Sequence, residues 1–127
     1  MKHYDPETPP VPAEWLALDE PHRVRLAESY HRAAREKVPN YTAHAAFHAI
    51  VENQIAEGLE PVVRAMTRLT KQGLSRHDAL HALGSVVAEH FFEAMSTEDE
   101  DFAATAQARY NAAVERLTAV EWKRKYG

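Results

Sequence analysis

Apolar residues recur every three or four positions along most of the chain, which is the spacing of one buried face of an α-helix. This pattern is interrupted at Val38-Pro39, Gly58, Gly73 and Ser96, where proline, glycine or a small polar residue favours a helix end. It predicts helices at about residues 20–37, 40–57, 60–72, 76–95 and 97–125. No segment shows the alternation typical of a strand. We therefore predict an all-α fold, a single compact bundle of about five helices over residues 19–127.

Residues 1–18 have a different composition from the rest of the chain. Four of the seven prolines precede Trp15, and proline at that density disfavours a helix. We expect an extended, Pro-rich N-terminal arm here. Trp15, Leu16 and Leu18 are the residues expected to attach this arm to the bundle.

Two predicted helices carry the same histidine motif, 33 residues apart. Each copy reads His, three residues, His, Ala and a branched apolar residue: His44 and His48 in the first copy, His77 and His81 in the second. A spacing of four places both imidazoles of a pair on one helix face, as in helical metal sites. Short connections make consecutive helices antiparallel, so the first and second motif helices run parallel. If these helices touch, all four imidazoles lie at a similar height.

Glu52 lies one turn beyond His48 and extends the first motif into a possible chelating pair. The predicted metal ligands are thus His44, His48, Glu52, His77 and His81. Imidazole and carboxylate ligands suit a divalent transition metal such as zinc, nickel, iron or manganese, and do not suit calcium or magnesium. If one coordination position stays open, the ion can activate water, with Glu52 or Glu89 as the base. On this interpretation the protein is a metal-dependent hydrolase.

The same residues also fit two readings without a metal. The histidines, together with Glu52, Asn53 and Gln54, can form a hydrogen-bond network that fixes helix packing in a non-enzymatic binding or structural protein, or can line a metal-free pocket. Asp78 has a sufficient role in capping the helix that begins after Ser75. His31 resembles the surface or outer-shell histidines of many helices, so we leave it outside the predicted ligand set.

Composition narrows the classes of partner. The chain has 127 residues, a net charge of −4, a pI near 6 and no cysteine. This charge gives no reason to expect nucleic acid or an anionic membrane as a partner, and the lack of cysteine excludes disulfides and thiol chemistry. We see neither a signal peptide nor an apolar run of membrane-spanning length, so we expect a cytoplasmic protein. An unknown small molecule as partner remains open, and so does an oligomer.

Several segments together resemble a family of small bacterial proteins catalogued as a domain of unknown function. The resemblance covers about residues 14–92. It rests on two motifs, His-x-x-x-Glu-Asn-Gln and Arg-His-x-x-x-His-Ala-x-Gly, which match His48 to Gln54 and Arg76 to Gly84. It implies that the functional residues are His48, Glu52, His77 and His81. Because some members differ around the first histidine, it does not extend to His44, and it implies neither a metal nor a substrate.

Overall fold

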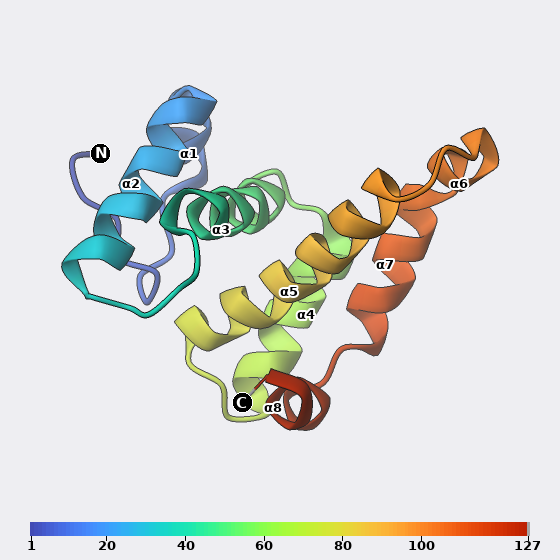
Figure 1. The fold of residues 1–127 in the computed structure, drawn as a ribbon. Helices are drawn as coiled ribbons and strands as arrows, with labels where there is room; N and C mark the ends of the chain where they lie inside the picture. Colours follow the sequence, from blue (N-terminus) through green and yellow to red (C-terminus); the bar gives the residue numbers. More distant parts are fainter. Residues whose placement is uncertain (127) are drawn as a thin grey trace.

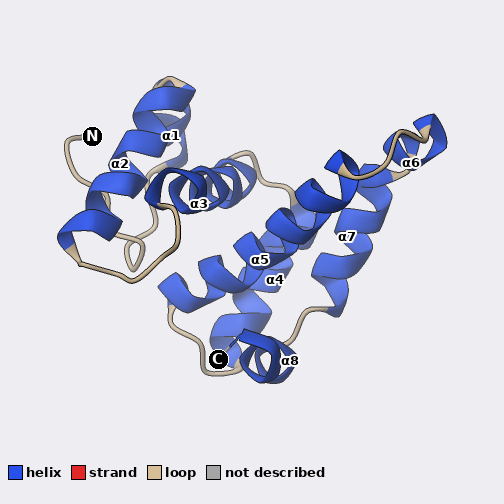
Figure 2. Cartoon of the chain, viewed as in Figure 1, coloured by secondary structure: helices blue, strands red, loops and turns tan. Residues whose placement is uncertain are grey.

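The computed structural model describes residues 1–126, and these form an all-helical fold without a strand (Figures 1 and 2). The prediction of an all-α chain is confirmed, but the described residues form eight helices and not about five. They are α1 (Pro12–Ala17), α2 (Glu20–Ala33), α3 (Tyr41–Ala56), α4 (Glu60–Lys71), α5 (Arg76–Met95), α6 (Glu100–Ala104), α7 (Ala106–Arg116) and α8 (Ala119–Tyr126).

Local capping residues set where the three site-bearing helices begin. Asp19, Asn40 and Ser75 are the N-caps of α2, α3 and α5, and each side chain accepts a hydrogen bond from the backbone N–H three residues further on. These contacts satisfy donors that have no partner inside the helix. Gly58 and Gly73 follow α3 and α4 with positive φ angles of 74° and 102°, which explains the helix ends predicted there.

The prediction of an extended arm is wrong for its last third. Residues 12–17 form the short helix α1, with Pro12 in its first position. Proline is tolerated there because the first N–H groups of a helix have no intrahelical partner anyway. Trp15 on α1 is fully buried and donates a 2.8 Å hydrogen bond from Nε1 to Asn53 Oδ1, so it attaches the N-terminal segment to α3 as expected.

The helix predicted for residues 97–125 is in fact α6, α7 and α8. Contacts from α4 stabilise the break between α7 and α8. Arg68 on α4 donates to the carbonyl oxygens of Val114 and Leu117 at 2.8 and 3.1 Å. Gln72 Oε1 accepts the N–H of Ala119 at 2.8 Å. These contacts satisfy the backbone groups that a helix break leaves free.

Helix α3 lies between two hydrophobic clusters. Its Ala45 and Ala49 pack into a smaller cluster with Tyr4, Trp15 and residues of α2, whereas Val51 belongs to a larger one formed with α4, α5, α7 and α8. Figure 1 shows α1 and α2 on one side of α3 and the remaining helices on the other. The start of α5 packs against α3, and its His77 ring lies 5.4 Å from the ring of His31 on α2. No helix among residues 1–126 is long and apolar enough to span a membrane.

Candidate metal centre

Five imidazoles from three helices converge where α2, α3 and α5 meet. His31 of α2 is at the middle of this histidine cluster. Its ring centroid lies 4.5 and 4.8 Å from those of His44 and His48 on α3, and 5.4 and 5.9 Å from those of His77 and His81 on α5. The two histidine pairs thus come together as the motif predicts.

The expectation that His31 lies on the surface is wrong. Its side chain is completely buried. The sequence holds a sign of this, because His31 follows Ala27 by four residues on the apolar stripe of α2, and Ala27 is also fully buried. A histidine that continues a buried stripe faces the same interior as the residues before it.

Glu36 is the carboxylate nearest the cluster, and sequence reasoning missed it. A Schellman motif places it there: Arg35 takes a left-handed φ of 55°, its N–H bonds Arg32 O, and the Glu36 N–H bonds His31 O. This turn directs the Glu36 carboxylate back over the end of α2. Its Oε2 lies 3.3 Å from His31 Nε2 and its Oε1 lies 3.5 Å from His77 Nε2.

The tautomer of His31 follows from its backbone contact. His31 Nδ1 is 2.6 Å from the carbonyl oxygen of Ala27, which can only accept, so Nδ1 carries a proton. In the neutral ring Nε2 then presents a lone pair to Glu36 Oε2. Two acceptors at 3.3 Å repel each other unless a proton or a metal ion lies between them.

A chain of buried polar groups fixes His48 in the same tautomer as His31, with the proton on Nδ1. Arg76 holds both oxygens of Glu52 at 2.7 and 2.8 Å. The Tyr4 hydroxyl donates to Glu52 and is 3.0 Å from His48 Nδ1. Because the Tyr4 proton is committed to Glu52, its oxygen accepts from His48 Nδ1–H, and the His48 Nε2 lone pair faces the cluster. Such a partner on the outer ring nitrogen is typical of metal-bound histidines.

Glu52 is therefore not among the side chains whose free ligand atoms face one another in the cluster. Both its oxygens are taken by Arg76 and Tyr4, and it is 1% exposed. Burial, reinforced by the charge of Glu52, raises the pKa of Tyr4 well above its usual range, which keeps its hydroxyl protonated. Glu89, the other candidate base, instead pairs with Lys125 and Tyr126 on α8. Asp78 is exposed at the capped start of α5.

The N-terminal segment closes one side of the centre. Besides Tyr4, which is buried, the carbonyl of Pro6 accepts from Arg76 at 2.8 Å, and Glu7 Oε1 accepts the backbone N–H of His77 at 3.1 Å. A carboxylate at a helix N-terminus is favourable for the helix dipole. Residues near the chain start thus fix the first turn of α5, which carries His77.

The four histidines of the repeated motif favour the neutral form. Burial lowers the pKa of His44 to about 4 and that of His81 to about 3, and neighbouring histidines add to both effects. Burial and the same neighbours hold the pKa of His48 well below its usual range. Burial also lowers the pKa of His77, against the opposing charge of Glu36. Neutral imidazole is the form that binds a metal ion.

The described residues include two overlapping groups whose ligand atoms all lie within 4.8 Å of one another. One group is His31, His48, His77 and His81, and the other is His31, Glu36, His44 and His81. Opposite donors on one ion lie at most about 4.4 Å apart, given bonds of about 2.0–2.2 Å. Moreover, the Nε2 atoms of His31, His48 and His77 are buried without a hydrogen-bond partner. The histidine cluster is therefore able to hold a metal ion.

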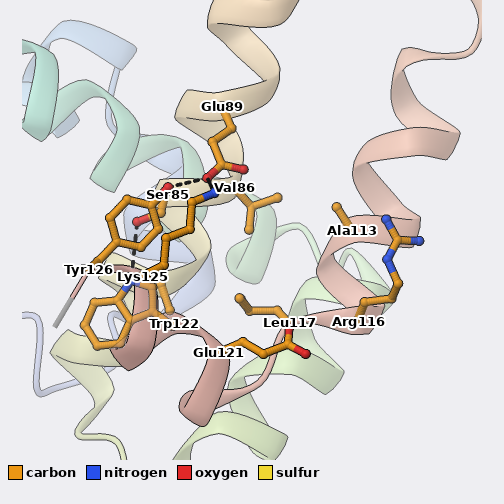
Figure 3. Close-up of a pocket in the computed structure, with 11 residues that line it drawn as sticks. Ser85, Val86, Glu89, Ala113, Arg116, Leu117, Glu121, Trp122, Lys125 and Tyr126 are labelled. Atoms are coloured by element: carbon orange, nitrogen blue, oxygen red, sulfur yellow. Dashed lines mark hydrogen bonds and ion pairs between the residues drawn. The ribbon is translucent and has the colours of Figure 1, made fainter.

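A groove of about 470 Å³ leads to the centre. His44, His48 and His81 form part of it, Phe47, Leu80, Trp122 and Tyr126 supply apolar walls, and Lys37 lies on its edge. Trp122 and Tyr126 also line a neighbouring pocket of about 200 Å³, where Trp122 bonds Ser85 and Lys125 pairs with Glu89 (Figure 3). Helix α8 thus forms a wall of the groove.

No family model, curated protein or solved structure shows significant similarity to this chain. The chemistry of the centre is therefore inferred from the arrangement of its own residues alone.

Proposed function

We propose that the protein binds a divalent transition metal at the histidine cluster and is a metal-dependent hydrolase of a small molecule. The observation that carries this proposal is the set of three buried, unpartnered Nε2 atoms, on His31, His48 and His77. An unpaired polar atom in the interior costs free energy, and a metal ion satisfies all three at once. The donors suit zinc, nickel, iron or manganese.

The proposed hydrolytic chemistry needs a water on the metal and a nearby carboxylate. Zinc and similar ions lower the pKa of bound water to about 7 when a coordination position is open. Glu36 is the carboxylate facing the donors, and its side chain is 26% exposed, so water reaches it. Glu52 instead orients His48 through Tyr4, because its oxygens are already engaged.

The groove favours a particular class of substrate. Its aromatic and aliphatic walls suit an apolar group of small-molecule size. Lys37 on the edge favours a carboxylate or phosphate on the same molecule. The reaction we propose is hydrolysis of an ester, amide or phosphate bond placed over the imidazoles of His44, His48 and His81.

A structural polar network is the second candidate. It is supported by Asn53, which joins Trp15 and Glu20, and by the bond of Tyr110 to Gln54 at 2.7 Å. These contacts connect the helices without any metal. A network serving only to hold helices together would, however, pair its buried donors and acceptors, and His48 Nε2 is buried without a hydrogen-bond partner or a facing carboxylate among the described residues.

Thermal unfolding with and without metal separates the two candidates. Protein purified without a histidine tag is stripped with a chelator and titrated with zinc, nickel, manganese or iron(II). A ligand that binds only the folded state at a hundredfold excess over its Kd stabilises by about 2.7 kcal/mol. We expect this gain in the wild type and its loss in His31→Ala. A comparable gain in His31→Ala, or none with any ion, contradicts the metal proposal.

A matched control distinguishes loss of the centre from loss of a half-buried histidine outside it. His90 is also on α5, but its Nδ1 bonds Val86 O at 3.0 Å and its ring faces Tyr110. We expect His90→Ala to keep the metal-induced gain. Metal-loaded wild type should hydrolyse chromogenic carboxyl or phosphate esters, whereas chelated protein and His48→Ala should not. Equal rates in all three would refute the hydrolase part alone.

A further inference from the structure

The face of α5 that lines the groove continues beyond it as an apolar stripe. Groove and stripe residues follow one another at steps of three or four, which places their side chains on one side of the helix. The groove residues of α5 include His81, Gly84, Ser85 and Ala88, and the stripe consists of Phe91, Phe92 and Met95. Groove and stripe thus lie on one face, which begins at the histidine cluster and runs toward the end of α5.

The stripe is apolar, but the fold does not cover it. Phe91, Phe92 and Met95 are 49, 60 and 70% exposed. Phe47 of α3, which lines the groove, packs its ring 5.7 and 6.2 Å from those of Phe91 and Phe92. It therefore connects the groove to the stripe. A contiguous exposed apolar surface of this kind marks an interaction site.

Small residues leave the middle of this face open. A Cβ atom at Gly84 would contact nothing packed against α5 within 4 Å, and Ala88, one turn further, adds only a methyl group. From His81 to Phe92 the helix advances eleven residues, about 16 Å at the helical rise. A narrow apolar surface of this length suits an extended hydrocarbon chain.

Charge and size decide between possible occupants. Lys37 and three imidazoles lie at the inner end of the face, where they suit a polar or anionic head group. Glu93 is exposed beside the stripe and the net charge is −4, which disfavours an anionic membrane surface. Three half-exposed side chains also supply well under the roughly 800 Å² per partner that a stable protein interface buries. An amphiphilic small molecule fits both ends.

We propose that this face binds the linear acyl chain of an amphiphilic substrate. The polar end of the substrate lies at the histidine cluster, and the chain extends over Gly84 to Phe91 and Phe92. This inference rests on the proposed function, because it names the substrate class of the same groove: esters and amides of long-chain carboxylic acids.

The first test is the binding of carboxylates of increasing chain length to the full chain in the presence of a chelator, by isothermal titration calorimetry below micelle-forming concentrations. Hexanoate, decanoate and tetradecanoate share one head group. Burial of a methylene is worth a factor of up to about four in affinity, so we expect affinity to rise about two- to fourfold per added methylene. Equal affinities for the three carboxylates would overturn the chain site.

Repeating the titrations with zinc separates this inference from the proposed function. Metal at the histidine cluster predicts tighter binding of all three carboxylates, because their head group can occupy an open coordination position. Chain-length dependence without a zinc effect would support the chain site and contradict the metal proposal. A zinc effect without chain-length dependence would do the reverse.

Variants locate the bound chain. The double variant Phe91→Ser, Phe92→Ser should weaken tetradecanoate binding at least about tenfold and leave hexanoate, which ends within the groove, unchanged. Gly84→Leu should weaken both, because its side chain fills the open space, and leucine favours a helix more than glycine does. Val63→Ser is the control, since Val63 is an exposed apolar residue of α4 outside the groove, and it should bind as the wild type does.

Two results with the double variant would overturn the proposal. One is unchanged tetradecanoate binding, which would place the chain elsewhere. The other is a wild-type dimer, seen by analytical ultracentrifugation, that is lost in the double variant and persists when tetradecanoate is added. That dimer would assign Phe91 and Phe92 to a second copy of the chain.

Discussion

Replacing Tyr4 with phenylalanine separates metal binding from packing. The phenyl ring keeps the contacts that Tyr4 makes with Trp15 and Tyr30, at centroid distances of 5.6 and 6.4 Å. Only the hydroxyl is lost. Glu52 remains bonded to Arg76 through both oxygens, so the group left without a partner is His48 Nδ1–H.

Two effects of the Tyr4→Phe change can be estimated. The unpaired N–H of His48, which is 2% exposed, should cost the metal-free protein about 1–3 kcal/mol. Loss of an outer partner of a metal-bound histidine typically weakens metal binding about 10–100-fold. At saturating metal, this loss lowers the metal-induced stabilisation by about 1.4–2.7 kcal/mol.

The assay is urea unfolding of wild type and variant, each with chelator and with excess zinc. Tyr110→Phe is the matched control, because its hydroxyl bonds Gln54 away from the cluster. It should cost about 0.5–1.5 kcal/mol and leave the metal-induced gain unchanged. If the zinc gain is as large in Tyr4→Phe as in Tyr110→Phe, the orientation of His48 by Tyr4 does not contribute to metal binding.

Three further predictions concern the surroundings of the centre. Arg76→Ala removes the counter-charge of the buried Glu52 carboxylate, which then keeps only the Tyr4 hydroxyl as a partner, and should cost about 3–5 kcal/mol; a change under 1 kcal/mol in urea unfolding would mean the pair is not intact in solution. Because His44 and His81 have folded pKa values of about 4 and 3, below the unfolded value of about 6.5, the unfolded state binds protons first as pH falls. Melting temperature of the metal-free protein should therefore drop between pH 6.5 and pH 4, and a flat profile would contradict the neutral cluster. Arg35→Gly removes the strain of a left-handed φ of 55° and should raise stability by about 0.5–1 kcal/mol with zinc affinity unchanged; a lower melting temperature would contradict the Schellman turn.

Local sequence features predict the helices that carry the centre. The caps Asn40 and Ser75 act through the next few residues, so they can be recognised from the chain alone. The motif histidines keep their helical spacing, and the contact of α3 with α5 brings them together as expected. The three-part ending of the chain could not be predicted, since its last break depends on Arg68 and Gln72, more than 40 residues earlier in the sequence.

Most residues missed at the centre could not be predicted because a backbone turn or a contact distant in sequence places them there. Glu36 is placed by the left-handed turn at Arg35, and no pattern of apolar residues predicts that backbone angle. Tyr4 meets His48 across 44 residues, and Pro6 meets Arg76 across 70. His31 differs, because its place on the buried stripe of α2 can be predicted from the sequence. A single histidine on that stripe does not, however, indicate the four imidazoles around it.

The most direct test of the account is X-ray absorption spectroscopy of the zinc-loaded protein. The proposed metal site predicts nitrogen neighbours at about 2.0–2.1 Å from zinc, with the outer-shell scattering of several imidazole rings. His31→Ala should reduce the number of rings, and His90→Ala should leave it unchanged. A shell made of oxygen atoms alone, or a spectrum unaffected by His31→Ala, would contradict metal binding by the histidine cluster.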